Sequence, residues 1–184
     1  KTYCENNEQL IAVDSLEKLL DIYNQHTNVR TEKIKEYLVE ATDQIKAKVS
    51  EYIEDCDVYN SSTWEDAEVD SFSVSSVDDF EINVIEVNDE ECQLTFDVQV
   101  EIKVEVTGPD FTNGVYDRED GHIYTFGSTS REETLSLEFK CELGLYYEYE
   151  SGELQNVEFG DFHIPNTSGG IEVSVEEHPE PDWY

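Results

Sequence analysis

Carboxylates are by far the commonest reactive side chains in this sequence. The 184 residues include 45 aspartates and glutamates against 11 lysines and arginines, for a formal net charge of −34. With so many acids almost any fold brings two together, so the adjacent pairs at 78–79 and 90–91 do not identify a general acid and its base. We therefore assign no catalytic residue, and a hydrolase that uses its own carboxylates is the least favoured class of function.

The segment DREDG, residues 117–121, is the strongest candidate for a metal site. It combines acids with a glycine, as calcium-binding loops do, but it lacks the ligand alternation and the final glutamate that such loops require. The sequence therefore predicts a solvated turn, with no bound metal and no cofactor. The histidines are widely spaced and form no metal-binding pattern: they are His26, His122, His163 and His178. Of these, His163 is expected to be a structural residue near a strand end.

The cysteines show no metal-ligand spacing. Cys4, Cys56, Cys92 and Cys141 form no CxxC pair, which argues against a zinc site. Cys92 and Cys141 fall on the apolar faces of predicted strands, where a thiol packs as a small apolar group. Free thiols predict a reducing, cytoplasmic location, although the even number of cysteines leaves a disulfide open.

The negative charge restricts the class of partner. It repels nucleic acid and anionic lipid, so we expect no direct nucleic-acid binding and no membrane contact. No apolar run is long enough to cross a bilayer. A solvated acidic surface, an adaptation to high salt, a basic protein partner and mimicry of a nucleic acid all stay open.

The front of the chain is predicted to form a strand and two helices. QLIAV, residues 9–13, has the composition of a short buried strand, and Asp14 or Ser15 then caps a helix. The apolar face of this helix consists of Leu16, Leu19, Leu20 and Tyr23. The polar residues 24–28 predict a break. Over residues 31–55 apolar side chains recur every third or fourth position, which predicts a second helix.

Later in the chain the periodicity becomes that of β-strands. Long alternating runs lie on both sides of NDEE, residues 88–91, and of Ser151–Gly152, and each pattern predicts a hairpin. A short strand, HIYTF at 122–126, lies among the loops between the two hairpins. The last predicted strand is GIEVSV, residues 170–175.

These patterns predict an α+β fold in which N-terminal helices pack on a long-stranded antiparallel sheet, a meander of about five to six strands. One face of the sheet is apolar and the other acidic, and the acids also protect the strand edges from pairing with other chains. The predicted units are a strand–helix–helix segment (1–56), a linker (57–68), an antiparallel β domain (69–176) and a tail (177–184).

The order of these elements resembles the C-terminal part of bacterial PIN-domain nuclease-like proteins that carry a long extension. The matching stretches are LIAVDSLEKLLDIY, IKEYLVEATDQIKAKVSEYIE, EECQLTFDVQVEIKVEVTG and REETLSLEFKCELGLYYEYE. In that family a strand and a helix close the nuclease domain, a long helix follows, and an acidic all-β extension comes last. The family's metal-binding acids precede every matched stretch, so the resemblance transfers no catalytic residue to this chain.

The resemblance implies a non-catalytic accessory or regulatory module of a metal-dependent ribonuclease, with that protein's own nuclease domain as its partner. The absence of methionine agrees with this interpretation, since it predicts a fragment or a processed product. The alternative is a free-standing acidic interaction module, which mimics a nucleic acid or inhibits a basic protein.

Overall fold

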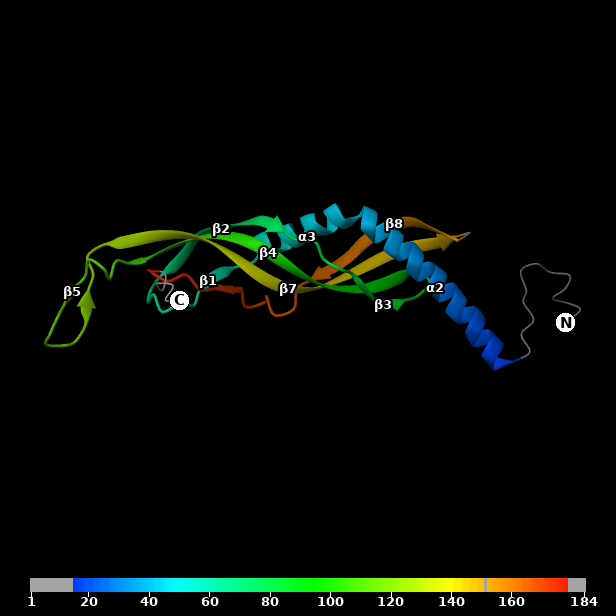
Figure 1. Cartoon of the computed structure of the whole chain (residues 1–184), viewed down its shortest axis with the longest axis horizontal. Helices are drawn as coiled ribbons and strands as arrows, with labels where there is room; N and C mark the ends of the chain where they lie inside the picture. Colours follow the sequence, from blue (N-terminus) through cyan, green and yellow to red (C-terminus); the bar gives the residue numbers. More distant parts are fainter. Residues whose placement is uncertain (1–14, 151, 179–184) are drawn as a thin grey trace, which may run out of the picture.

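The computed structural model describes residues 15–150 and 152–178, with residues 21–26 described by their backbone alone. Within these ranges lie two helices, α2 (Leu16–Glu40) and α3 (Thr42–Glu54), and nine strands (Figure 1). The strands are β1 (Val58–Asn60), β2 (Glu68–Val77), β3 (Asn83–Val87), β4 (Glu91–Pro109), β5 (Val115–Tyr116), β6 (Ile123–Tyr124), β7 (Ser128–Glu150), β8 (Glu153–His163) and β9 (Ile171–Val173). The predicted strand 9–13 and most of the predicted tail lie outside the described residues.

Two long strands form the centre of the sheet. β4 has 19 residues and β7 has 23, and they pair antiparallel without a register shift from Glu91–Tyr146 to Pro109–Ser128. β2 and β3 pair one after the other along the far edge of β4, and β8 pairs with the last part of β7. The result is a curled five-stranded antiparallel sheet (Figure 1). The predicted α+β class and both predicted hairpins are confirmed.

One pairing differs from the predicted meander. β1 and β9 form a separate parallel pair, with Val58 opposite Ile171 and Asn60 opposite Val173. The backbone N–H of Ile171 donates to the carbonyl oxygen of Asp57 at 2.7 Å. The chain therefore leaves the large sheet after β8 and joins a strand that lies more than a hundred residues earlier, a contact that no local pattern indicates.

The predicted linker, residues 57–68, is part of the folded structure. It contains β1, and its Trp64 is 4% exposed. The indole N–H of Trp64 donates to the carbonyl oxygen of Pro109 at 2.9 Å, at the end of β4. Gly108 permits this approach, because a Cβ atom there would lie 2.6 Å from Cε2 of the indole ring. The core thus continues across the boundary predicted between the helical segment and the β domain.

The polar break predicted at 24–28 is wrong, because α2 continues through it. Polar side chains lower helix propensity only slightly, and this stretch has neither glycine nor proline to end a helix. The break comes instead at Ala41, inside the single helix predicted for 31–55. Ser15 acts as the N-cap: its Oγ accepts a hydrogen bond from the backbone N–H of Lys18 at 3.2 Å.

The core lies between one face of the sheet and the helices. The even-numbered residues of β4 from Cys92 to Val106 are each at most 1% exposed, which confirms the predicted alternation. Ile45, Val49 and Ile53 of α3 are fully buried in the same apolar cluster. The helix-on-sheet packing holds only in part, since Leu16 in the first turn of α2 is 72% exposed.

Candidate functional site

The DREDG segment forms the turn between β5 and β6. The carboxylate of Asp117 accepts a hydrogen bond from the backbone N–H of Glu119 at 2.8 Å, and that of Asp120 accepts one from His122 at 2.9 Å. The hydroxyl of Tyr124 donates to Asp120 as well, and this bond lowers the pKa of Asp120. The predicted turn is present, and the acids of this segment stabilise it.

In the part of the chain that the structure describes, no group of three or more histidine, cysteine, aspartate or glutamate side chains could hold a metal ion. The predicted candidates are not brought together. His122 lies in the β5–β6 turn and His163 at the end of β8, both exposed, while the ring of His178 contacts the hydroxyl of Thr112. His26 lies within α2.

The buried cysteines are structural. Cys92 and Cys141 carry free thiols and are 1% and 0% exposed, which confirms that they pack as small apolar groups. Burial raises the pKa of each thiol to about 12, so neither is a nucleophilic thiolate at neutral pH. Cys56 is also free, and burial raises its pKa. Cys4 lies outside the described residues.

The face of the sheet that points away from the helices is polar and negative, and we call it the acidic face. Its charged residues in β4 and β7 are Glu91, Asp97, Glu101, Lys103, Glu105, Glu132, Glu138, Lys140, Glu142, Glu148 and Glu150. Glu105 lies directly opposite Glu132, a repulsive arrangement that Lys103 partly relieves by an ion pair with Glu132 at 2.7 Å. With nine acids to two lysines in these strands, this face is suited to a cationic surface and not to nucleic acid.

The hairpin of β5 and β6 lies at the far end of the long ribbon (Figure 1). It gathers exposed apolar side chains. Phe126 is 88% exposed, and the other four are 47 to 60% exposed. We call these five residues the apolar tip: Val115, Tyr116, Ile123, Tyr124 and Phe126. Clustered exposed apolar and aromatic side chains are typical of protein interfaces.

The first turns of α2 carry a second exposed apolar group. Leu16, Leu19 and Leu20 are 72%, 50% and 51% exposed, and we call them the leucine stripe. They share one face of the helix, as the sequence predicts, but this face lies beyond the core of the sheet. Neither α2 nor α3 is long and apolar enough to cross a membrane.

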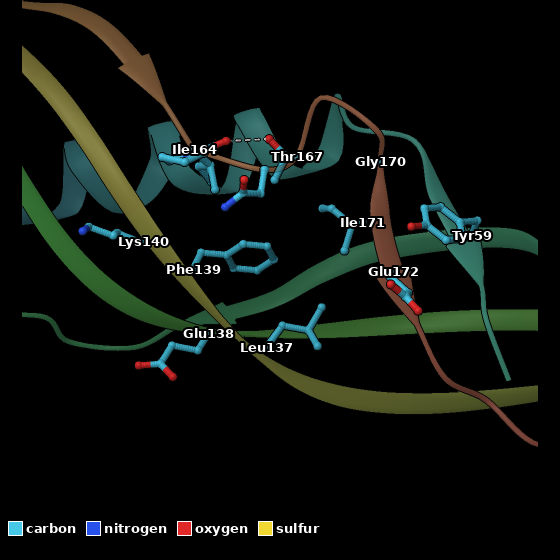
Figure 2. A pocket seen from close by; sticks show the side chains of 12 residues that line it. Tyr59, Leu137, Glu138, Phe139, Lys140, Ile164, Thr167, Gly170, Ile171 and Glu172 are labelled. Atoms are coloured by element: carbon cyan, nitrogen blue, oxygen red, sulfur yellow. Dashed lines mark hydrogen bonds between the residues drawn. The ribbon is translucent and has the colours of Figure 1, made fainter.

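A cleft of about 470 Å³ opens beside the middle of β7 (Figure 2). Apolar side chains line it from two sides: Leu137 and Phe139 come from β7, and Ile164 and Ile171 come from the segment between β8 and β9 and from β9. Charged and polar side chains also border it: Glu138, Lys140, Glu172 and Tyr59. The cleft thus combines an apolar wall with a mostly acidic border.

The segment that closes one side of the cleft has a fixed shape. The hydroxyl of Thr167 donates to the carbonyl oxygen of Ile164 at 2.8 Å (Figure 2), and Oη of Tyr52 lies 3.2 Å from Oγ1 of Thr167. Gly170 has a φ of +92°, and a Cβ atom there would lie 2.9 Å from the carbonyl oxygen of Asp57. A side chain at this position would be strained, so glycine is required. The cleft is therefore built into the fold.

Neither a protein-family model, nor a curated protein, nor a solved structure matches this chain. The resemblance to PIN-domain proteins therefore stays a prediction. The sequence did not identify the cleft, since its walls come from β1, β7 and β9, which only long-range pairing brings together. The apolar tip had a local signal, the aromatic residues of HIYTF, but a short strand alone does not show whether another element will cover its side chains.

Proposed function

We propose that this chain is a non-catalytic accessory module of a PIN-type ribonuclease-like protein, and that the leucine stripe of α2 contacts the nuclease domain. The exposure of Leu16, Leu19 and Leu20 is the observation that carries this proposal, since an apolar helical face is expected to pack against another surface. Burying one leucine side chain stabilises a contact by about 1.5–3 kcal/mol. The resemblance supports the same contact, because it assigns this helix to the closing elements of the nuclease domain.

In this arrangement the acidic face regulates access to the nuclease. Its negative potential keeps RNA from approaching in unproductive directions, or it occupies a basic groove until RNA displaces it. Both roles need the charge of the sheet and neither needs a reactive group on it. The partner of the acidic face is then the parent protein's own nuclease domain.

The mass of the native protein, with mapping of its N-terminal peptides, tests the proposal first. We expect a product much larger than 21.2 kDa, with acid-bearing strands before Lys1. A native product that begins at or just before Lys1 would contradict the proposal. In the larger protein, removal of the β domain after Val69 should change the nuclease rate or the RNA affinity at low salt.

The leucine stripe can be tested in the same protein. Replacing Leu16, Leu19 and Leu20 by serine should expose the start of α2 to limited proteolysis, because the contact with the nuclease domain is lost. The matched control is Val39→Ser, since Val39 is 76% exposed on the same helix but lies outside the stripe. Equal cleavage rates in the triple variant and the control would contradict the contact.

A second candidate function is a free-standing acidic module that inhibits or sequesters a basic protein. The acidic face and the apolar tip favour it together, because a basic partner with an apolar pocket could bind both. The test uses a panel of purified cationic proteins at low and physiological salt. A salt-sensitive complex whose affinity falls in the Phe126→Ser variant supports this function. An affinity that is unchanged in this variant reflects charge alone.

A further inference from the structure

The edge of β7 is open next to the cleft. β8 pairs with β7 only between Glu142 and Glu150, and among the described residues no strand pairs with the other side of Ser128–Cys141. At Arg131 the guanidinium group contacts the carbonyl oxygens of Glu176 and Glu177, so the C-terminal segment covers that end. Within the described ranges, the stretch between this contact and the start of the β8 pairing is a free strand edge.

The direction of the backbone groups on this edge follows from two hydrogen bonds. The backbone N–H of Tyr147 donates to the carbonyl oxygen of Glu90 at 2.8 Å, so it points from β7 toward β4. The backbone N–H of Asp78 donates to the carbonyl oxygen of Gln99 at 2.9 Å, so the backbone groups of Gln99 point to the side of β4 that faces away from β7. Gln99 is directly opposite Glu138, in a register with no shifts. In antiparallel pairs the bonded and non-bonded positions alternate. The backbone N–H and C=O of Glu138 therefore point away from β4, toward the open edge.

The same alternation applies to Thr134, Ser136 and Lys140, whose backbone groups also point to the open edge. A strand added here would continue the position of β8 along β7. Its side chains would alternate between the two faces of the sheet. Those on the inner face would enter the cleft against Phe139 and Ile171, and those on the outer face would join the acidic face.

We propose that the cleft and the open edge of β7 bind an extended segment of a partner protein, added as an antiparallel strand, in which apolar residues alternate with lysine or arginine. The apolar residues fill the wall formed by Leu137, Phe139, Ile164 and Ile171. The basic residues meet Glu138 and Glu172, with Lys140 as the one cation at this border. This binding mode goes beyond both proposed functions and does not depend on either.

The charge of the chain argues for a partner protein over a second copy. Edge-to-edge pairing of two β7 strands would bring Glu132 and Glu138 of each copy against an equally acidic chain with a net charge of −34. Like charges on neighbouring strands destabilise a sheet. A cationic segment removes this repulsion and supplies the missing backbone partners, which is the mode of recognition used where a peptide completes a sheet edge.

The test uses two peptides of alternating valine and lysine, about nine residues long, within the usual length of a strand. In one, the backbone nitrogens of the valines are methylated; in the other, those of the lysines are. In antiparallel pairing, the peptide residues opposite Glu138 and Lys140 lie on the same face of the sheet as these two side chains, and they point their N–H groups toward β7. These are the positions of the peptide's lysines. The lysine-methylated peptide therefore cannot pair. Both peptides carry the same charge, so nonspecific attraction to the acidic face is equal.

We expect the valine-methylated peptide to bind at least about tenfold more tightly, since several net hydrogen bonds of about 0.5–1.5 kcal/mol are at stake. On binding, the backbone amides of Ser136, Glu138 and Lys140 should be protected from hydrogen exchange. The exchange rate of the Phe139 amide, which points toward β4, should not change. Equal affinity of the two peptides, or binding without this alternating protection, would overturn the proposal.

A pair of variants separates the backbone from the charge. Lys140→Pro removes the N–H that faces the open edge, a position where a strand tolerates proline, and should weaken binding about tenfold. Lys140→Ala should leave binding unchanged or strengthen it, because only a positive charge is removed. Unchanged binding by folded Lys140→Pro, or a dimer of the chain alone that protects the same amides, would also overturn the proposal.

Discussion

The middle of the β4–β7 ribbon and the β5–β6 hairpin at its end both carry apolar and aromatic side chains, yet Phe96 is 1% exposed and Phe126 is 88% exposed. The difference lies in what covers them. Ile45, Val49 and Ile53 of α3 share the buried cluster with Phe96, whereas the hairpin extends beyond the helices (Figure 1). Alternation defines two faces of a strand, but another element decides whether the apolar face is buried.

The two regions therefore differ in what their aromatic side chains do. In the ribbon, burial of apolar area stabilises the fold. At the tip, the same kind of side chain contributes little to folding and remains available to a partner. Substitutions matched between the two regions should separate these effects, beginning with the largest.

Truncation of a core phenylalanine should have the largest effect. Phe96 stacks on Phe80 with ring centroids 4.5 Å apart, so Phe96→Ala loses the ring and leaves a cavity. We expect it to lower the free energy of unfolding by about 3–5 kcal/mol. Phe126→Ala should change it by less than about 0.5 kcal/mol. Urea unfolding followed by circular dichroism measures both, and similar losses in the two variants would contradict the comparison.

Alkaline pH should destabilise the middle of the sheet through its thiols. Cys92 and Cys141 have pKa values of about 12 in the folded chain, whereas an unfolded cysteine ionises near about pH 8.5. At pH values between these two pKa values, the folded state binds more protons than the unfolded state. The stability is therefore complete below the unfolded pKa and falls as the pH rises, by about 1.4 kcal/mol per pH unit for each thiol.

The measurement is urea unfolding under reducing conditions at a series of pH values above neutrality. The double variant Cys92→Ala, Cys141→Ala should flatten the dependence, because it removes both thiols. A slope that persists in this variant would assign the loss to other groups, among them Tyr147, whose pKa burial raises to about 12.

Two glycines give the next contrast. At Gly108 a Cβ atom would lie 2.6 Å from the indole of Trp64, so Gly108→Ala must displace the ring and should cost about 1–3 kcal/mol. At Gly127, near the apolar tip, a Cβ atom would meet nothing within 4 Å, and Gly127→Ala should lie within about 0.5 kcal/mol of the parent. Trp64 fluorescence reports the displacement, and an unchanged spectrum in Gly108→Ala would contradict it.

The local features of the fold could be predicted from sequence. The phase of β4, the turns at 88–91 and 151–152, and the cap at Ser15 each depend on residues close in the chain. The parallel β1–β9 pair could not, because Val58 and Ile171 are joined only by the tertiary fold. Nor could the continuation of α2 through 24–28, where polar composition resembled a loop but contained no residue that ends a helix.

The candidate sites divide in the same way. DREDG, at 117–121, could be predicted as a turn because it lacks the ligand pattern of a calcium loop, and in the structure its acids bond to neighbouring backbone N–H groups. The cleft depends on Tyr59, Phe139 and Ile171, which come from three strands far apart in sequence. The open edge of β7 depends on where β8 stops pairing, at Glu142, and strand register is set by tertiary packing as much as by pattern.

The smallest effect should come from two tyrosines whose pKa values are raised for different reasons. Burial raises that of Tyr147, whereas at the apolar tip the hydrogen bond to Asp120 raises that of Tyr124. Asp120→Ala should therefore bring the pKa of Tyr124 down toward its usual value and leave Tyr147 unchanged. Site-resolved NMR titration of the tyrosine rings measures both. If the pKa of Tyr124 stays raised in the variant, then the tip is covered by some other contact and the contrast between the two regions is smaller than the exposures imply.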